Sequence, residues 1–94
     1  MIVRWAFGAL DDLISIESYQ RRHWPESRAT FERRLTAIER RIAEFPQSAP
    51  EVTQRSGVRV VAFIDLPYRL FYTVESDAII VLAIRRASRQ SLFE

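Results

Sequence analysis

The stretch that decides the fold runs from Gly57 to Arg89 and reads G-V-R-V-V-A-F-I-D-L-P-Y-R-L-F-Y-T-V-E-S-D-A-I-I-V-L-A-I-R-R-A-S-R. It contains three apolar runs rich in β-branched and aromatic residues, separated by short breaks at residues 65–67 and 75–77. Runs of this length, with breaks this short, predict a three-stranded antiparallel meander.

Arginines stand at set places on this predicted sheet. Arg59 lies in the first strand, Arg69 in the second, and Arg85, Arg86 and Arg89 lie where the third strand ends. Around residues 85–89 the positive charge is not balanced by nearby acids, so we interpret these arginines as a surface that binds an anionic group or a macromolecular target. For Arg69 two interpretations stay open: a structural arginine tied to backbone carbonyls and a carboxylate, or an arginine that faces a ligand.

Alternation along the three strands predicts two largely apolar faces. In the third strand, it places Ile80, Leu82 and Ile84 on one face and Ile79 and Val81 on the other. Because both faces are apolar, we expect one side of the sheet to be covered and the other side to be covered at least in part.

The chain before the meander predicts a strand and two helices. Residues 1–6 alternate as a short strand that we expect at an edge of the sheet. Residues 8–23 have a helical period, and the apolar face is expected to comprise Ala6, Ala9, Leu10, Leu13, Ile14, Ile16 and Tyr19. In residues 26–45 the apolar positions are Phe31, Leu35, Ile38, Ile42 and Phe45. The break at Trp24-Pro25 predicts an antiparallel helical hairpin, whose apolar side can be buried only against the sheet.

The charged residues of the two helices have simple structural interpretations. Asp11 and Asp12 are expected in the first helical turn, where the helix dipole favours acids; neighbouring helical positions diverge by about 100°, so the two carboxylates cannot converge on one substrate atom. The arginines of residues 33–41 alternate with acids, which favours a solvated face over a nucleic-acid-binding helix.

Composition narrows the function further. The 94 residues predict one domain, residues 1–94, and the absence of cysteine excludes disulfides and thiolate metal sites. All 14 basic residues are arginine, and the formal net charge is only +2, which is low for a general nucleic-acid-binding protein. No apolar run is long enough to span a membrane, so we expect a cytoplasmic protein. With a single histidine, His23, and no known cofactor motif, we expect no metal and no cofactor, and protein-based acid–base catalysis is poorly supplied.

The order of these elements and several short motifs resemble the RelE/ParE superfamily of type II toxin–antitoxin and plasmid-stabilisation systems. The matching residues are Ala9, Asp12, Leu13, Ile16 and Tyr19 in the first helix, Pro46 after the second helix, Gly57 and Arg59, the run P-Y-R-L-x-Y from Pro67 to Tyr72, and the basic cluster from Arg86 to Arg89. The resemblance implies an α+β toxin fold, in which an N-terminal strand and an antiparallel helical hairpin pack on a small antiparallel sheet.

The resemblance leaves two branches to weigh. RelE-like members are ribosome-dependent mRNA endonucleases that use basic residues, an arginine in the second meander strand and a late tyrosine or histidine. Arg69 matches that arginine, but this chain has no lysine, has Phe93 about where the tyrosine stands, and has Arg86 at the histidine position of ParE-like members. Arginine stabilises charge but carries protons poorly, so the nuclease set looks incomplete.

We therefore expect the ParE-like branch, a binder rather than an enzyme, which inhibits DNA gyrase by protein–protein contact and is neutralised by a cognate antitoxin. The alternatives are a RelE-like ribosome-dependent mRNA endonuclease and a degenerate, non-toxic relative. The residues expected to bind the target are Arg59, Arg69, Arg85, Arg86 and Arg89; those expected to bind the antitoxin are Phe31, Leu35, Tyr68, Tyr72 and Arg69. In that family the antitoxin wraps the toxin, and the arginines here suit an acidic, disordered partner that folds on binding.

Overall fold

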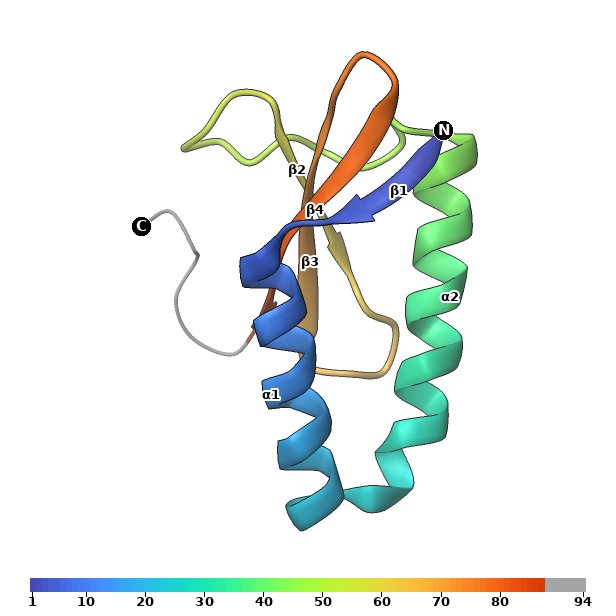
Figure 1. The fold of residues 1–94 in the computed structure, drawn as a ribbon, viewed down its shortest axis with the longest axis vertical. Coiled ribbons are helices and arrows are strands. Elements are labelled where there is room, and N and C mark those ends of the chain that lie inside the picture. The colour runs from blue at the N-terminus through green and yellow to red at the C-terminus, as the bar shows by residue number, and fades with distance from the viewer. Residues whose placement is uncertain (88–94) are drawn as a thin grey trace.

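A computed structural model, which describes residues 1–87, has two helices packed on one sheet (Figure 1). The elements in chain order are β1 (Ile2–Trp5), α1 (Phe7–His23), the short 3₁₀ helix η1 (Pro25–Ser27), α2 (Arg28–Glu44), β2 (Val58–Ala62), β3 (Tyr68–Val74) and β4 (Ala78–Arg86). The predicted meander and helical hairpin are confirmed, and the architecture is α+β as expected.

The sheet has the strand order β1-β4-β3-β2. Strands β2, β3 and β4 are antiparallel neighbours, whereas β1 lies at the edge, as predicted, and runs parallel to β4. The sheet is therefore mixed. The hydrogen-bonded pattern continues past the end of β1, because the Ala6 amide donates to the Val81 carbonyl at 2.9 Å.

Both helices cover the same face of the sheet. In Figure 1, α1 and α2 run antiparallel on the two sides of the molecule and meet at η1. The main core contains Ala9 from α1, Phe31 and Ile42 from α2, and Tyr72 and Val81 from the sheet, all of them buried. The opposite face has a smaller cluster, made by Val52, Val58, Phe71 and Ala83. Residues 45–57, which connect α2 to β2, supply Val52 and so cover part of this second face.

The buried face of α1 differs from the prediction. Ala9 is fully buried and Leu13 and Ile16 are half-buried against the core, but the Leu10 and Ile14 side chains are 39% and 63% exposed. The small residues Gly8 and Ala9 turn toward the sheet; a Cβ at Gly8 would lie 4.0 Å from the Leu82 carbonyl oxygen. The α1 backbone therefore lies close to β4 at its small residues, and this orientation leaves the larger Leu10 and Ile14 side chains exposed. The helix begins at Phe7, so Asp12 is not in its first turn.

In α2 the predicted apolar face is confirmed for Phe31, Ile38 and Ile42, which are buried, while Leu35 is half-buried. The prediction that Phe45 belongs to this buried face is wrong. Phe45 follows the last helical residue, its backbone leaves the helical conformation, and its side chain is 55% exposed.

A β-bulge in β4 overturns part of the predicted alternation. Tyr72 pairs with Val81 and Phe71 with Ala83, so Leu82 is an extra residue in the ladder. Beyond the bulge the side chains change faces. Ile84 therefore lies in the helix-side core with Val81, whereas strict alternation predicted the opposite face.

A candidate arginine-lined binding site

The predicted target-binding arginines fall into different environments. Arg59, on β2, points toward the helix side, where its guanidinium donates to the Ala49 carbonyl at 2.6 Å and to the Gln47 carbonyl at 3.4 Å. Arg59 thus holds the connector between α2 and β2 against the sheet.

Tyr72 supports the same connector from the neighbouring strand β3. Its hydroxyl donates to the Pro46 carbonyl at 2.7 Å. Burial raises the pKa of Tyr72, while the backbone of Ala49 and the charge of Arg59 act in the opposite direction. The protonated phenol is the form that can donate to Pro46, and the raised pKa extends this form to higher pH.

Arg85, at the end of β4, forms an ion pair with Asp12 of α1. The second oxygen of the Asp12 carboxylate accepts a hydrogen bond from the Ile84 amide at 3.0 Å. Because β1 pairs with β4 only as far as Val81, this part of β4 has an open edge, and Asp12 satisfies an amide there. The predicted role of Asp12 at the helix dipole is replaced by this link between α1 and β4.

Arg86, the next residue, is exposed and lies over the ring of Tyr19, with 5.6 Å between the guanidinium carbon and the ring centroid. This is a cation–π distance. Arg89, the last of the predicted arginines, lies outside the described residues, as does Phe93.

Arg69 differs from the other predicted target-binding arginines that the structure describes, because its guanidinium has no partner among residues 1–87. It is exposed on β3, on the face opposite the helices, and stands directly across from Arg85 of β4. Within residues 1–87 its guanidinium makes no hydrogen bond or ion pair. The Arg85 charge is already compensated by its ion pair with Asp12, so within residues 1–87 Arg69 is the arginine of this cross-strand pair whose guanidinium is available to an anion. Of the two interpretations left open for Arg69, the arrangement favours the ligand-facing one.

Two depressions lie beside Arg69. The first, the edge groove, has a volume of about 540 Å³ and runs along the outer edge of β2; its lining includes Arg41, Pro50, Val60, Val61, Ala62 and Arg69. The second, the outer hollow, has a volume of about 330 Å³ and lies on the sheet face opposite the helices; its lining includes Glu51, Val52, Thr53, Gln54, Arg69 and Phe71.

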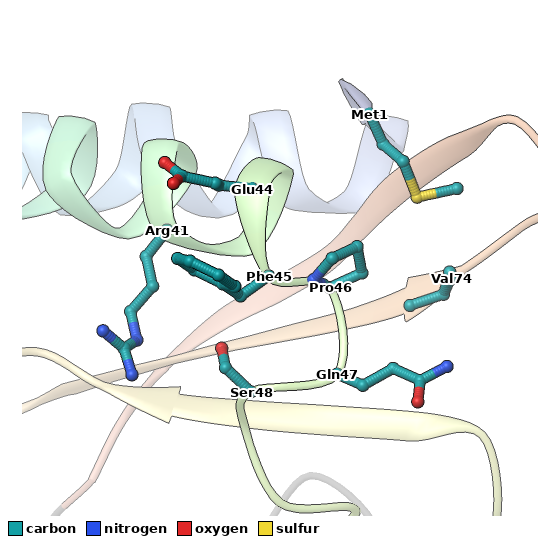
Figure 2. Close-up of a pocket in the computed structure, with 8 residues that line it drawn as sticks. All are labelled: Met1, Arg41, Glu44, Phe45, Pro46, Gln47, Ser48 and Val74. Carbon is teal, nitrogen blue, oxygen red and sulfur yellow. The ribbon is translucent and has the colours of Figure 1, made fainter.

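The edge groove continues at both ends. Between α2 and β2 it meets a depression of about 320 Å³ that includes Arg34, Ala37 and Ile64. Past Ser48 it meets an apolar hollow of about 680 Å³ at the end of α2. Figure 2 shows this hollow, with Arg41 of α2 and Phe45, which follows α2, on one side and Val74 of β3 on the other. Arg41 lines all three depressions.

Three residues predicted to contact an antitoxin are not at the surface. Phe31, Tyr68 and Tyr72 are at most 2% exposed and form the core between α2 and the sheet. Phe31 packs on Tyr68 edge-to-face, with ring centroids 5.5 Å apart. These aromatic side chains hold the helix on the sheet and offer no surface to a partner. Of that predicted set, Arg69 is exposed and Leu35 is half-buried.

Groups that could transfer protons are scarce around Arg69. Glu51 is the titratable carboxylate in the outer hollow, and it accepts a hydrogen bond from the Gly57 amide at 2.7 Å. His23 lies at the far end of α1. Over residues 1–87, no group of three or more histidine, cysteine or acidic residues is placed to hold a metal ion. The same residues include no helix long and apolar enough to cross a membrane.

Sequence reasoning missed two residues of this site. Arg41 was assigned to a solvated helix face, yet it points toward the β2 edge; its spacing of three from Ile38, a core residue, was the signal. Glu51 lies in the connector, which has no periodic pattern, and nothing in the sequence indicated that it would approach Arg69.

One family model matches the sequence of this chain, and two solved structures superpose on its fold. The family model described as the ParE toxin of the type II toxin-antitoxin system, parDE, matches residues 3–91. A chain of the chromosomal ParDE TA system from P. aeruginosa superposes with a TM-score of 0.75 at 22% identity, covering 94% of this chain and 97% of that chain. The isolated E. coli RelE toxin superposes with a TM-score of 0.58 at 17% identity, covering 98% of this chain and 89% of that chain. No curated protein sequence matches this chain.

Proposed function

The chain belongs to the ParE toxin family of type II toxin–antitoxin systems, and from this premise we propose that it inhibits DNA gyrase by protein–protein binding and is neutralised by a cognate antitoxin. Gyrase and antitoxin are cytoplasmic partners, so the proposal places the chain in the cytoplasm.

The observation that carries the target proposal is the environment of Arg69. The Arg69 guanidinium is exposed on a sheet face and has no partner among residues 1–87, whereas Arg85, opposite it in the ladder, is paired with Asp12. A permanently charged planar fork recognises a carboxylate well but exchanges protons poorly. This chemistry supports binding to an acidic protein surface more than it supports phosphodiester cleavage. Arg86 lies on the helix side of the sheet, over the ring of Tyr19, and Arg59 donates to the connector, so neither shares the face of Arg69.

The proposed antitoxin site is the edge groove with its two extensions. Their linings carry Arg34, Arg41 and Arg69 and the acid Glu44; Arg34 is paired with Asp65 at 3.5 Å, so Arg41 and Arg69 supply the positive charge of the path. Exposed apolar side chains such as Phe45 and Ile64 stand at the two ends. A disordered segment with acidic and apolar residues would find partners for both along this path.

The proposal is tested with purified protein in a gyrase supercoiling assay. We expect inhibition at micromolar concentration, relief on adding the antitoxin, and loss of inhibition in Arg69→Ala. The matched control is Arg33→Ala, an exposed arginine on α2 away from both depressions. The gyrase assignment is refuted if supercoiling continues unchanged while the wild-type chain still stops growth. A chain that leaves growth unaffected without antitoxin would be the degenerate, non-toxic relative.

A RelE-like mRNA endonuclease is the second candidate, and one observation favours it. Glu51 and Arg69 line the same outer hollow, which brings a carboxylate near a phosphate-binding fork. If Glu51 is a general base, Glu51→Gln should abolish cleavage of ribosome-bound mRNA at codon boundaries during toxicity. Intact transcripts in cells arrested by the wild-type chain would rule this candidate out.

A further inference from the structure

The outer face of α1, the side turned away from the sheet, carries apolar side chains. Phe7 is 88% exposed, Ile14 is 63% exposed and Leu10, at the margin of this face, is 39% exposed. They follow one another at spacings of three and four residues, so they are neighbours along one side of the helix. Single exposed apolar residues are ordinary, but a row of them on one face is typical of an interaction surface.

The middle of this face has the shape that receives another helix. In packed helices, a side chain of one helix inserts into a hole formed by four residues of the other. Residues 11, 14, 15 and 18 have the spacing of such a hole, and two of them are small serines, Ser15 and Ser18. Ile14 stands next to residue 15, the midpoint of α1. Two copies of α1 that cross antiparallel at Ile14 would therefore pair over the full length of the helix.

The charges on the same face are ordered along α1. Asp11 lies in the first half of the helix and Arg21 and Arg22 lie in its last turn; all three are exposed and form no ion pair within residues 1–87. An antiparallel crossing at Ile14 brings Asp11 of one copy beside Arg21 of the second copy. It also brings Phe7 to the two arginines, where its ring can make a cation–π contact. A parallel pair would instead oppose like charges, so the face is complementary to itself only about a two-fold axis.

We propose that two copies of this chain associate through α1, antiparallel, about a two-fold axis at Ile14. The inference does not depend on the proposed target. The footprint is that of a 17-residue helix, about 25 Å long and about 10 Å wide, which is small beside the roughly 800 Å² per partner of a stable interface. The dimer is therefore weak, with a Kd of about 10–1,000 μM.

The dimer leaves the candidate binding site exposed. The outer hollow, which Arg69 lines, lies on the sheet face opposite the helices, whereas α1 packs against β4 on the helix side. A second copy on the outer face of α1 therefore covers neither Arg69 nor the hollow. One dimer presents two such surfaces, which favours a target that offers two acidic sites.

Sedimentation velocity of the purified chain, from about 10 μM to about 1 mM, tests the proposal. We expect the wild-type chain to change from monomer to dimer within this range. Ile14→Arg should stay monomeric, because it places two like charges at the two-fold axis. Ile2→Arg is the matched control: Ile2 is 61% exposed on β1, away from α1, so this variant should dimerise like wild type. The proposal is overturned if wild type stays monomeric or if Ile14→Arg dimerises equally well.

A charge exchange tests the antiparallel geometry. Asp11→Arg and Arg21→Glu should each weaken self-association by at least about tenfold, because each places like charges together twice across the axis. A mixture of the two variants should associate like wild type, since the reversed charge of each then faces an opposite charge on the other. If the mixture associates no better than either variant alone, the arrangement is wrong.

The absence of cysteine permits a direct readout. Ile14→Cys places two thiols at the two-fold axis, so mild oxidation should link two chains by a disulfide. Ser18→Cys is the control: it lies four residues past Ile14 in opposite directions on the two chains. The two thiols are then about 12 Å apart along the helix axis, beyond the reach of a disulfide. Equal cross-linking of the two variants would contradict the proposed axis.

Discussion

Replacing Asp12 by alanine should destabilise the fold by about 1.5–4 kcal/mol. The carboxylate, whose side chain is 17% exposed, accepts the Ile84 amide and pairs with Arg85. A hydrogen bond to a charged group contributes about 1.5–3 kcal/mol, and an ion pair with a half-exposed arginine adds about 0–1 kcal/mol. Asp12→Ala removes both interactions and leaves the partly buried Ile84 amide without an acceptor.

Two further variants separate the contributions. Asp12→Asn keeps an oxygen that can accept the Ile84 amide but removes the ion pair, so we expect a loss of about 1 kcal/mol. Arg85→Gln removes only the ion pair and should cost about 0–1 kcal/mol. Urea unfolding followed by tryptophan fluorescence measures all three. In a domain of this size, 1 kcal/mol shifts Tm by about 4–8 °C, so Asp12→Ala should lower Tm by more than about 6 °C. The reasoning fails if Asp12→Ala is no less stable than Arg85→Gln.

Three other predictions follow from the structure. Tyr72→Phe should lower the free energy of unfolding by about 1 kcal/mol because the Pro46 carbonyl loses its donor. Because the pKa of Tyr72 is raised in the folded protein, the stability that its protonated hydroxyl contributes is fully present below the unfolded pKa of about 10 and is lost as pH rises through the folded pKa. The fall in stability above pH 10 should therefore be shallower in Tyr72→Phe than in wild type. Gln20→Met should stabilise the fold by about 1 kcal/mol in thermal unfolding, because the fully buried Gln20 amide has no partner among residues 1–87; an unchanged or lower Tm would contradict this. Ile14→Ser should change stability by less than about 0.5 kcal/mol because Ile14 is exposed, whereas Leu13→Ser should cost more than about 1 kcal/mol because Leu13 packs against the core. A larger loss from Ile14→Ser than from Leu13→Ser would mean that α1 buries Leu10 and Ile14 instead.

The sequence predicted those parts of the fold that depend on local patterns. Short breaks such as residues 75–77 marked the strand ends, and the spacing of Phe31, Ile38 and Ile42 identified the buried face of α2. The rotation of α1 was not predictable in this way, because it depends on close approach at Gly8 and Ala9. The bulge at Leu82 could not be predicted either. Residues 78–84 are all apolar, so the sequence does not show whether the side chains alternate strictly or change faces partway along the strand.

The candidate site was predicted only in part. The sequence indicated Arg69 as a possible ligand contact, and the structure places it on an exposed face without a partner in the described region. It could not show that Arg59 would bind carbonyls of the connector, because those acceptors belong to the backbone of an irregular segment. Tyr68 and Tyr72 were expected to contact the antitoxin, yet both lie on the strand face opposite Arg69 and are buried in the core.

The pairing of β1 with β4 also determines how late in synthesis the sheet can be completed. Ile2 is aligned with Ala78, 76 residues later, and β4 is the strand that pairs with β1 in the sheet. At about 5–20 residues per second, ribosomes need roughly 4–15 s to add those residues. Throughout that interval the nascent chain carries an unpaired first strand and lacks Arg85 and Arg86. The edge of the sheet that β1 and β4 form, with Arg85 and Arg86 at the end of β4, is therefore completed only near the end of translation.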